Sequence, residues 1–138
     1  RKAGHEFGAT TGRPRRCGWL DLPQLKYAVM VNGVTQLCMM KADVLGEFEE
    51  IQVCTHYMYK GEKIDYLPYG IEPDEVQPVY KTFECWPGDL TGLREVENIP
   101  TSLMNYVKMI EEETGVPISI LSVGPDREQT LLLNEDLK

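Results

Sequence analysis

The chain has 138 residues, with 14 basic and 22 acidic side chains and a net charge of −8. Its length fits one domain, and its 42% hydrophobic and 26% charged residues are typical of a folded globular protein rather than a disordered one. The acidic balance argues against nucleic-acid binding. No run of about 18 apolar residues predicts a membrane span, and no basic and apolar leader predicts secretion.

Residues 1–20 predict a loop, because glycines interrupt them and no apolar periodicity is present. Residues 1–16 carry five basic groups and one acid, Glu6, for a balance of +4, which leaves −12 on the rest of the chain. A short cationic segment on an acidic body favours a site for a small anion.

Within this segment, residues 8–16 form what we call the arginine-rich loop, which contains two threonines and three arginines. The planar fork of an arginine can bind a carboxylate or a phosphate through two parallel hydrogen bonds. The loop is not a Walker A loop, since no lysine follows its second glycine. Spacing alone leaves two interpretations open: an anion site, or a basic loop that only improves solubility.

A helix is predicted next, with Asp21 as its N-cap and Asn32-Gly33 as its stop. Residues 36–40 are continuously apolar after Gln36 and predict a short buried strand. Its carboxyl end leads directly into Lys41-Ala42-Asp43, which we call the K-A-D segment.

Residues 51–59 and 62–67 predict an antiparallel hairpin around Lys60-Gly61. The proline-rich residues 68–78 predict a loop, and residues 79–85 a further short strand.

A second helix is predicted from a cap at Thr101 or Ser102 to a stop at Gly115. Residues 118–121 predict a strand, and residues 129–133 an edge strand. Helices alternating with strands and one hairpin predict an α/β fold, with a mixed sheet and flanking helices. The predicted apolar face of the second helix consists of Leu103, Tyr106, Val107 and Ile110.

The cysteines and histidines show no pattern that predicts a catalytic or metal site. The sequence contains no C-x-x-C pair, so we expect buried reduced thiols rather than disulfides or zinc ligands. His5 and His56 have no partner at metal-ligand spacing and are interpreted as structural or surface residues. The four cysteines are Cys17, Cys38, Cys54 and Cys85.

A K-x-D pattern after a buried strand can recognise guanine. The Asp43 carboxylate would accept hydrogen bonds from the ring N–H and the exocyclic amine, while the stem of Lys41 packs on the base. Adenine offers no such donor pair. The alternative is a surface lysine followed by an aspartate that caps a short helix.

Ser122-Val123-Gly124, here called the S-V-G segment, follows another predicted strand and continues into Pro125-Asp126-Arg127. Ligands of open α/β sheets bind beyond the carboxyl ends of the strands, so this segment could share a pocket with Lys41 and Asp43. A plain turn is the alternative.

The three segments together are more specific than each alone. G-A-T-T-G-R-P-R-R-C-G-W-L-D (8–21), K-A-D-V-L (41–45) and S-V-G-P-D-R (122–127) closely resemble, in this order and separation, the C-terminal part of the adenylosuccinate synthetase family. The resemblance implies part of a cytoplasmic, homodimeric ligase of purine biosynthesis, which uses GTP and Mg²⁺ to join inosine monophosphate (IMP) and L-aspartate. It implies no membrane or nucleic-acid partner.

The resemblance also implies roles for individual residues. Two positions depart from the pattern of many relatives: Pro14, where another basic residue is common, and Met40, where threonine often precedes the lysine. The implied aspartate and IMP contacts are Ala9, Thr10, Thr11, Gly12, Arg13, Pro14 and Arg15. The implied GTP contacts are Arg15, Lys41, Ala42, Asp43, Ser122, Val123 and Gly124.

The family's glycine-rich phosphate segment, Mg²⁺ ligands and catalytic Asp and His belong to its N-terminal portion, and no segment of these 138 residues matches them. We therefore expect a single C-terminal domain, with a substrate loop at 1–20 and a guanine-binding body at 21–138, that is inactive alone and holds no metal ligand or catalytic residue. The alternative is a guanine-nucleotide-binding or interaction module without catalysis.

Overall fold

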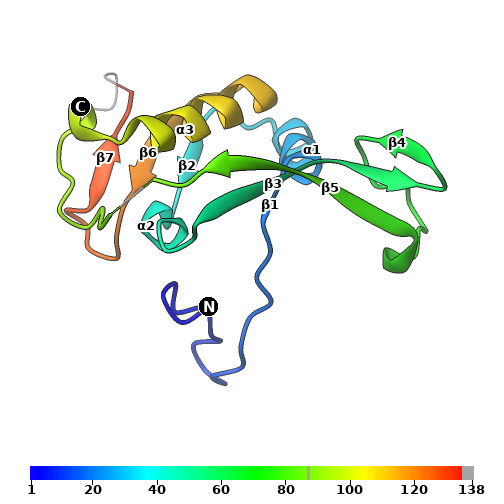
Figure 1. The fold of residues 1–138 in the computed structure, drawn as a ribbon, viewed down its shortest axis with the longest axis horizontal. Helices are drawn as coiled ribbons and strands as arrows, with labels where there is room; N and C mark the ends of the chain where they lie inside the picture. Colours follow the sequence, from blue (N-terminus) through cyan, green and yellow to red (C-terminus); the bar gives the residue numbers. More distant parts are fainter. Residues whose placement is uncertain (87, 135–138) are drawn as a thin grey trace.

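Two small mixed β-sheets and the helices beside them form the protein (Figure 1), as seen in a computed structural model that describes residues 1–86 and 88–134. This arrangement confirms the predicted α/β class with its mixed pairing, flanking helices and hairpin, although the strands divide between two sheets rather than one. The N-terminal segment lies below both sheets in this view and folds back on itself (Figure 1).

The first sheet is organised around the long strand β3 (Glu50–Tyr59). One side of β3 pairs in parallel with β1 (Leu20–Asp21) and, further along, in antiparallel with β4 (Glu62–Ile64). Its other side pairs in antiparallel with β5 (Val76–Glu84). The predicted hairpin is confirmed, with a second arm that ends at Ile64 rather than residue 67.

The start of β5 was also predicted wrongly. The proline-rich stretch does not remain a loop to residue 78, because β5 already begins at Val76 and Pro78 lies opposite Tyr57 of β3. Among the described strands β5 pairs only with β3. An edge strand tolerates proline, since its outward N–H positions need no strand partner.

The second sheet has the order β2-β6-β7. Strand β2 (Leu37–Met39) runs parallel to β6 (Ile118–Ser122), and β7 (Thr130–Leu132) pairs with β6 in antiparallel. The expectation that β2 is buried was wrong: it is an edge strand, and Cys38 at its centre is exposed. The central strand β6 is the buried one.

Two longer helices begin and end largely as predicted. At the start of α1 (Leu22–Asn32), the Asp21 carboxylate accepts a hydrogen bond of 3.1 Å from the Gln24 N–H, and Gly33 ends the helix in the left-handed conformation with φ 59°. Helix α3 (Thr101–Thr114) ends at Gly115 as predicted, but its N-cap is Pro100 and no side chain caps it. The short helices are α2 (Ala42–Leu45), η1 (Pro73–Glu75) and η2 (Val96–Asn98).

The core is centred on Trp86, which is fully buried and packs at a tilt against Tyr106 of α3, with ring centroids 5.5 Å apart. Phe83 of β5 meets the same tyrosine edge-on at 6.0 Å. The predicted face of α3 is thereby confirmed as buried. Fully burying one large apolar side chain contributes about 1.5–3 kcal/mol, so this cluster holds the two sheets and α3 together. Its other members are Leu22, Ala42, Ile51, Val53, Leu90, Leu103, Val107, Ile110, Ile118, Leu121, Val123 and Leu131.

The cysteines are free, and their burial differs from the prediction. Cys54 is buried and Cys85 half-buried, where burial raises the pKa of both thiols. Cys17 and Cys38 are exposed, because one lies in the N-terminal segment and the other on an edge strand.

None of the helices within the described ranges is long and apolar enough to cross a membrane.

Candidate functional site

The K-A-D and S-V-G segments lie at the same edge of the second sheet. Strands β2 and β6 are parallel neighbours, and Met39 lies opposite Leu121 where both strands end. Because parallel strands finish at the same edge, the chain delivers Lys41 and Ser122 side by side. The structure thus brings together the two segments that the sequence placed on separate strands.

The K-A-D segment packs against the buried core. Ala42 is completely buried, and its carbonyl accepts a hydrogen bond of 3.0 Å from the Trp86 indole N–H. Asp43 lies in the first turn of α2 and is half-buried, so it does not cap this helix as the alternative interpretation required. The capping position belongs to Lys41, whose φ of 62° places a non-glycine residue in the left-handed region.

The S-V-G segment forms a closed turn. The Ser122 hydroxyl donates to the Gly124 carbonyl at 3.0 Å, and the Val123 N–H donates to the Gln129 carbonyl at 2.8 Å. Gly124 approaches Gln129 so closely that an added Cβ would lie 2.2 Å from the Gln129 side-chain oxygen. The Gln129 amide in turn donates to the Thr91 carbonyl at 3.0 Å, which ties this turn to the neighbouring loop.

The arginine-rich loop is a tight reversal that starts with a bridge between Phe7 and Pro14. The Gly8 N–H donates to the Arg13 carbonyl at 2.8 Å, and the Gly12 N–H donates to the Gly8 carbonyl at 2.8 Å. Gly12 adopts a φ of 65°, which glycine reaches without strain. The Thr11 hydroxyl accepts from the Arg13 N–H at 3.3 Å. Residues 9–15, which include Ala9 and Thr10, are all exposed, so their side chains are available to a ligand.

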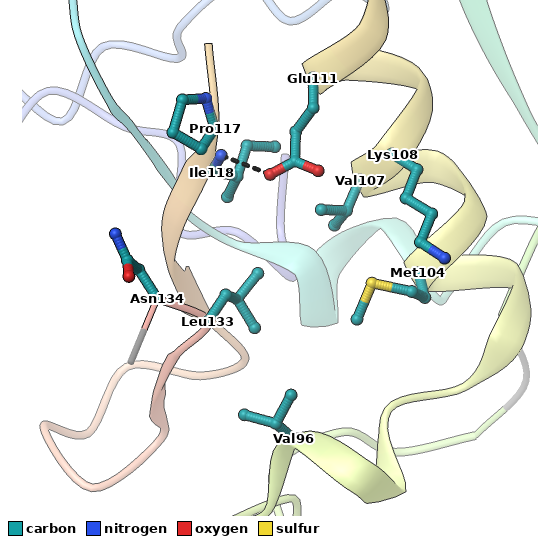
Figure 2. A pocket seen from close by; sticks show the side chains of 9 residues that line it. All are labelled: Val96, Met104, Val107, Lys108, Glu111, Pro117, Ile118, Leu133 and Asn134. Atoms are coloured by element: carbon teal, nitrogen blue, oxygen red, sulfur yellow. Dashed lines mark hydrogen bonds between the residues drawn. The ribbon is translucent and has the colours of Figure 1, made fainter. Parts of the chain in front are cut away.

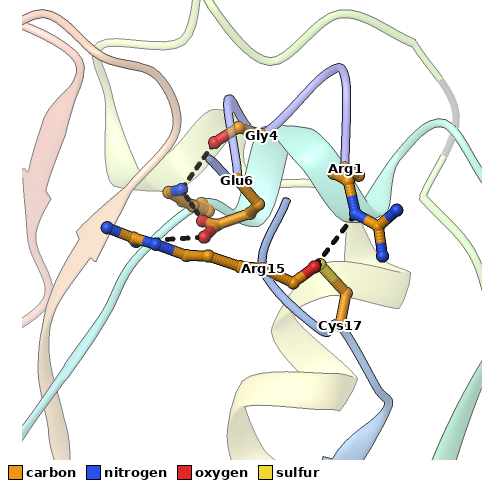
Figure 3. Close-up of polar contacts among 6 residues, drawn as sticks. Arg1, Gly4, Glu6, Arg15 and Cys17 are labelled. Carbon is orange, nitrogen blue, oxygen red and sulfur yellow. Dashed lines mark hydrogen bonds and ion pairs between the residues drawn. The ribbon is translucent and has the colours of Figure 1, made fainter. Parts of the chain in front are cut away.

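Glu6 joins the arginine-rich loop to the K-A-D segment (Figure 3). One of its carboxylate oxygens pairs with the Arg15 guanidinium at 3.2 Å, and the other pairs with the Lys41 ammonium. The same ammonium donates to the Gly4 carbonyl at 2.6 Å, while Arg1 donates to the Arg15 carbonyl at 2.9 Å. Hydrogen bonds from Lys41, which is the larger cause, and from Arg15 hold the pKa of Glu6 below its usual 4.5. The Glu6 carboxyl is therefore ionised at neutral pH.

A cavity of about 410 Å³ opens beside this ion-pair cluster. Its walls come from the N-terminal segment, from α2 and its flanks, and from β5. Of the predicted site residues only Lys41 lines it, together with Glu6, Trp19, Phe48 and Tyr80 among others. Paired Lys41 and Glu6 thus share this cavity with apolar and aromatic side chains.

Another cavity, of about 320 Å³, lies between α3, the start of β6 and the residues after β7 (Figure 2). None of the predicted site residues lines it. Its carboxylate, Glu111, accepts a hydrogen bond of 2.7 Å from the Ile118 N–H and so holds the end of α3 to β6. This cavity is therefore separate from the candidate site.

In the part of the chain that the structure describes, no three His, Cys, Asp or Glu side chains gather closely enough to hold an ion.

Three residues that shape the site were not predicted: Glu6, Trp86 and Gln129. The lone acid in a segment with five basic groups was a usable signal for Glu6, since an isolated carboxylate among cations tends to pair with them. Trp86 and the amide of Gln129 bind carbonyls about 40 positions away in the chain, and the local sequence carries no sign of these two contacts.

Comparison with known proteins places these segments in a wider context. The family model of adenylosuccinate synthetase matches residues 1–131. The chain is 58% identical over 130 residues to adenylosuccinate synthetase of Flavobacterium psychrophilum and 60% identical to that of Flavobacterium johnsoniae, covering 94% of this chain and 31% of each relative. It also matches the structure of fully ligated adenylosuccinate synthetase from Plasmodium falciparum, with a TM-score of 0.87 and 36% identity over 97% of this chain and 33% of that one.

The match is therefore strong but partial, because the chain spans about a third of the length of these relatives. All three predicted segments lie within the range that the family model covers. So do both sheets, except for Leu132 at the end of β7. The chain belongs to the adenylosuccinate synthetase family.

Proposed function

We propose that this chain supplies the aspartate and guanine contacts of a GTP-dependent ligase, which joins IMP and L-aspartate to give adenylosuccinate, GDP and phosphate. The observation that carries the proposal is the convergence at one sheet edge of the K-A-D and S-V-G segments, with the arginine-rich loop tied to them through Glu6. Family membership supports the same reaction.

In this proposal the guanine base binds at the edge formed after β2 and β6. The Asp43 carboxylate accepts hydrogen bonds from the ring N–H and the exocyclic amine, a donor pair that adenine lacks. Since Ala42 and Val123 are fully buried, the backbone on both sides of the base is held by the core. The remaining guanine contacts are Lys41, Ser122 and Gly124.

Aspartate binds at the arginine-rich loop. Its carboxylate meets the forked donor of Arg13, next to the hydroxyls of Thr10 and Thr11 and the backbone of Gly12. Ala9 and Pro14 frame this turn, and Arg13 also lies near the IMP ribose. Arg15, already directed toward Lys41 by Glu6, faces GTP.

The ligase reaction as proposed uses Mg²⁺ to neutralise phosphate charge. Among the described residues no three His, Cys, Asp or Glu side chains gather closely enough to hold an ion, and we assign no step through the metal to them.

A chimera tests the proposal: this segment replaces the matching third of the Flavobacterium johnsoniae relative. We expect GTP-dependent formation of adenylosuccinate from IMP and aspartate, with ATP a poor substitute. The 138-residue chain by itself is expected to form none, since it contains no phosphate-binding G-x-x-x-x-G-K run. A folded chimera that does not turn over, beside an active parent enzyme, would contradict the proposal.

A further inference from the structure

We propose that Glu6 is a positioning residue for the guanine nucleotide, which orients Lys41 and Arg15 through a single shared carboxylate. The inference rests on the proposed function, because it assigns Glu6 a role toward the same nucleotide. Glu6 itself touches neither the base nor the aspartate in this assignment; it acts through its two cationic neighbours.

The two oxygens of Glu6 serve different partners. One pairs with Arg15 (Figure 3), and the other pairs with Lys41, which lies 35 positions further along the chain. The Glu6 side chain is 24% exposed, whereas those of Arg15 and Lys41 are 59% and 50% exposed. The carboxylate is therefore the sheltered partner of both pairs, and the two cations present their outer surfaces to solvent, where a ligand would arrive.

Lys41 depends on this arrangement more than an ordinary surface lysine does. Its backbone lies in the left-handed region, a conformation that persists in a non-glycine residue only where its surroundings hold it. The Gly4 carbonyl and the Glu6 carboxylate both accept from its ammonium, and the core fixes Ala42 directly after it. Exposed ion pairs contribute little to stability, so the consequence of this one is orientation.

Charge makes a second contribution. Without the Glu6 carboxylate, the Arg15 and Lys41 side chains would face each other with no anion between them and would move apart into solvent. Binding of a nucleotide would then have to order both side chains, and the affinity for the nucleotide would fall. With Glu6 present they are held in place beforehand, which lowers the cost of binding.

The chimera carrying Glu6→Gln tests this role, because glutamine keeps the shape and removes the charge. We expect the KM for GTP to rise roughly 10-fold, as loss of charge-assisted hydrogen bonds implies, while kcat and the KM for aspartate stay within about twofold. Glu6→Asp keeps the charge on a shorter stem and should recover part of the loss. Glu49→Gln removes the same charge from an exposed residue outside the ion pairs of the described residues and should change nothing.

A double substitution separates positioning from folding. If Glu6 acts through Arg15, then Glu6→Gln should cost clearly less affinity for GTP in an Arg15→Leu background than in the unaltered chimera. Equal rises in the KM for GTP, IMP and aspartate, or an unchanged KM for GTP, would overturn the role of Glu6.

The proposed function and the role of Glu6 fail in different ways. An unaltered chimera that neither turns over nor binds a fluorescent GTP analogue would overturn both. If the unaltered chimera and its Glu6→Gln variant bound the analogue equally well, only the role of Glu6 would be overturned. Titration with the analogue also covers variants too slow for steady-state kinetics.

Discussion

The K-A-D and S-V-G segments, which together form what we call the guanine edge after the proposed ligand, and the arginine-rich loop are held in place by different forces. At the guanine edge, Ala42 and Val123 are fully buried, and the Trp86 indole binds the Ala42 carbonyl from inside the core. The arginine-rich loop has no core contact of this kind: residues 9–15 are exposed, and hydrogen bonds within the loop and the ion pair of Glu6 with Arg15 define its shape.

This difference predicts how each region responds to change. A side chain at the guanine edge can be replaced without moving the backbone that carries it, so only the contact itself is lost. The loop can adjust its backbone when a side chain changes, and it can close further around a ligand, as exposed binding loops commonly do. Substitutions in the two regions should therefore give different kinetic signatures.

The largest effect is expected from removing the support of the guanine edge. Trp86→Ala deletes a fully buried ring, its contact with Tyr106 and the hydrogen bond to Ala42. The free energy of unfolding should fall by about 3–5 kcal/mol, as for other buried aromatic truncations. Urea unfolding of the 138-residue chain measures it. Tyr69→Ala, at a fully exposed position, is the control and should stay within about 0.5 kcal/mol. Equal losses would show that Trp86 does not support the fold.

The next effect concerns the base contact alone. Asp43→Asn in the chimera should weaken GTP by about 2–4 kcal/mol, because a recognition group loses its paired donors. Xanthosine triphosphate should become the better substrate, since the new amide can donate to its 2-oxo group. Steady-state kinetics with each nucleotide varied in turn measures the change. An unchanged KM for GTP, with xanthosine triphosphate used no better, would refute the guanine assignment.

Local signals in the sequence explain which parts of the fold could be predicted. Asp21, Gly33 and Gly115 mark helix ends by chemistry confined to a few neighbouring residues, and Lys60-Gly61 marks the hairpin in the same way. The prediction failed where the outcome depends on which strand lies beside which. Strand β2 has the composition of a central strand, yet it lies at an edge, so Cys38 is exposed.

The candidate site shows the same division. The motifs locate Lys41, Asp43 and Ser122 at strand ends, but their proximity follows from the parallel pairing of β2 with β6, which composition does not specify. The left-handed backbone of Lys41 was also not predictable, since lysine has no preference for it. The choice of Lys41 as a partner of Glu6 depends on how the N-terminal segment packs against the rest of the chain, which the local sequence does not specify.

A third prediction concerns the loop. Arg13→Leu in the chimera should raise the KM for aspartate by roughly 10²-fold, because losing a charge-assisted paired contact costs ~3 kcal/mol. GTP should be affected far less, and Arg13→Lys should recover only part, since an ammonium lacks the planar fork. Arg15→Leu is the matched comparison and should weaken GTP more than aspartate. Equal losses for all three substrates in both variants would mean that the loop only folds the site.

The smallest effect is the pH dependence of the contact that joins the two regions. Because the pKa of Glu6 is lowered in the folded protein, its solvent-exposed ion pairs slightly stabilise the fold above the usual value of 4.5, and this effect is lost as the pH falls through the lowered pKa. The melting temperature of the chain should therefore exceed that of Glu6→Gln at about pH 6, and the difference should shrink toward about pH 3.

Salt identifies the source of this effect. Asp89 also has a lowered pKa, but its partners are the hydroxyl and N–H of Thr91, which are neutral, whereas those of Glu6 are cations. About 1 M salt reduces the screening length to ~3 Å, so it should remove most of the difference between the unaltered chain and Glu6→Gln while leaving that for Asp89→Asn. If salt left both differences intact, hydrogen-bond geometry rather than charge would join the loop to the guanine edge, and the argument for electrostatic positioning by Glu6 would fail with it.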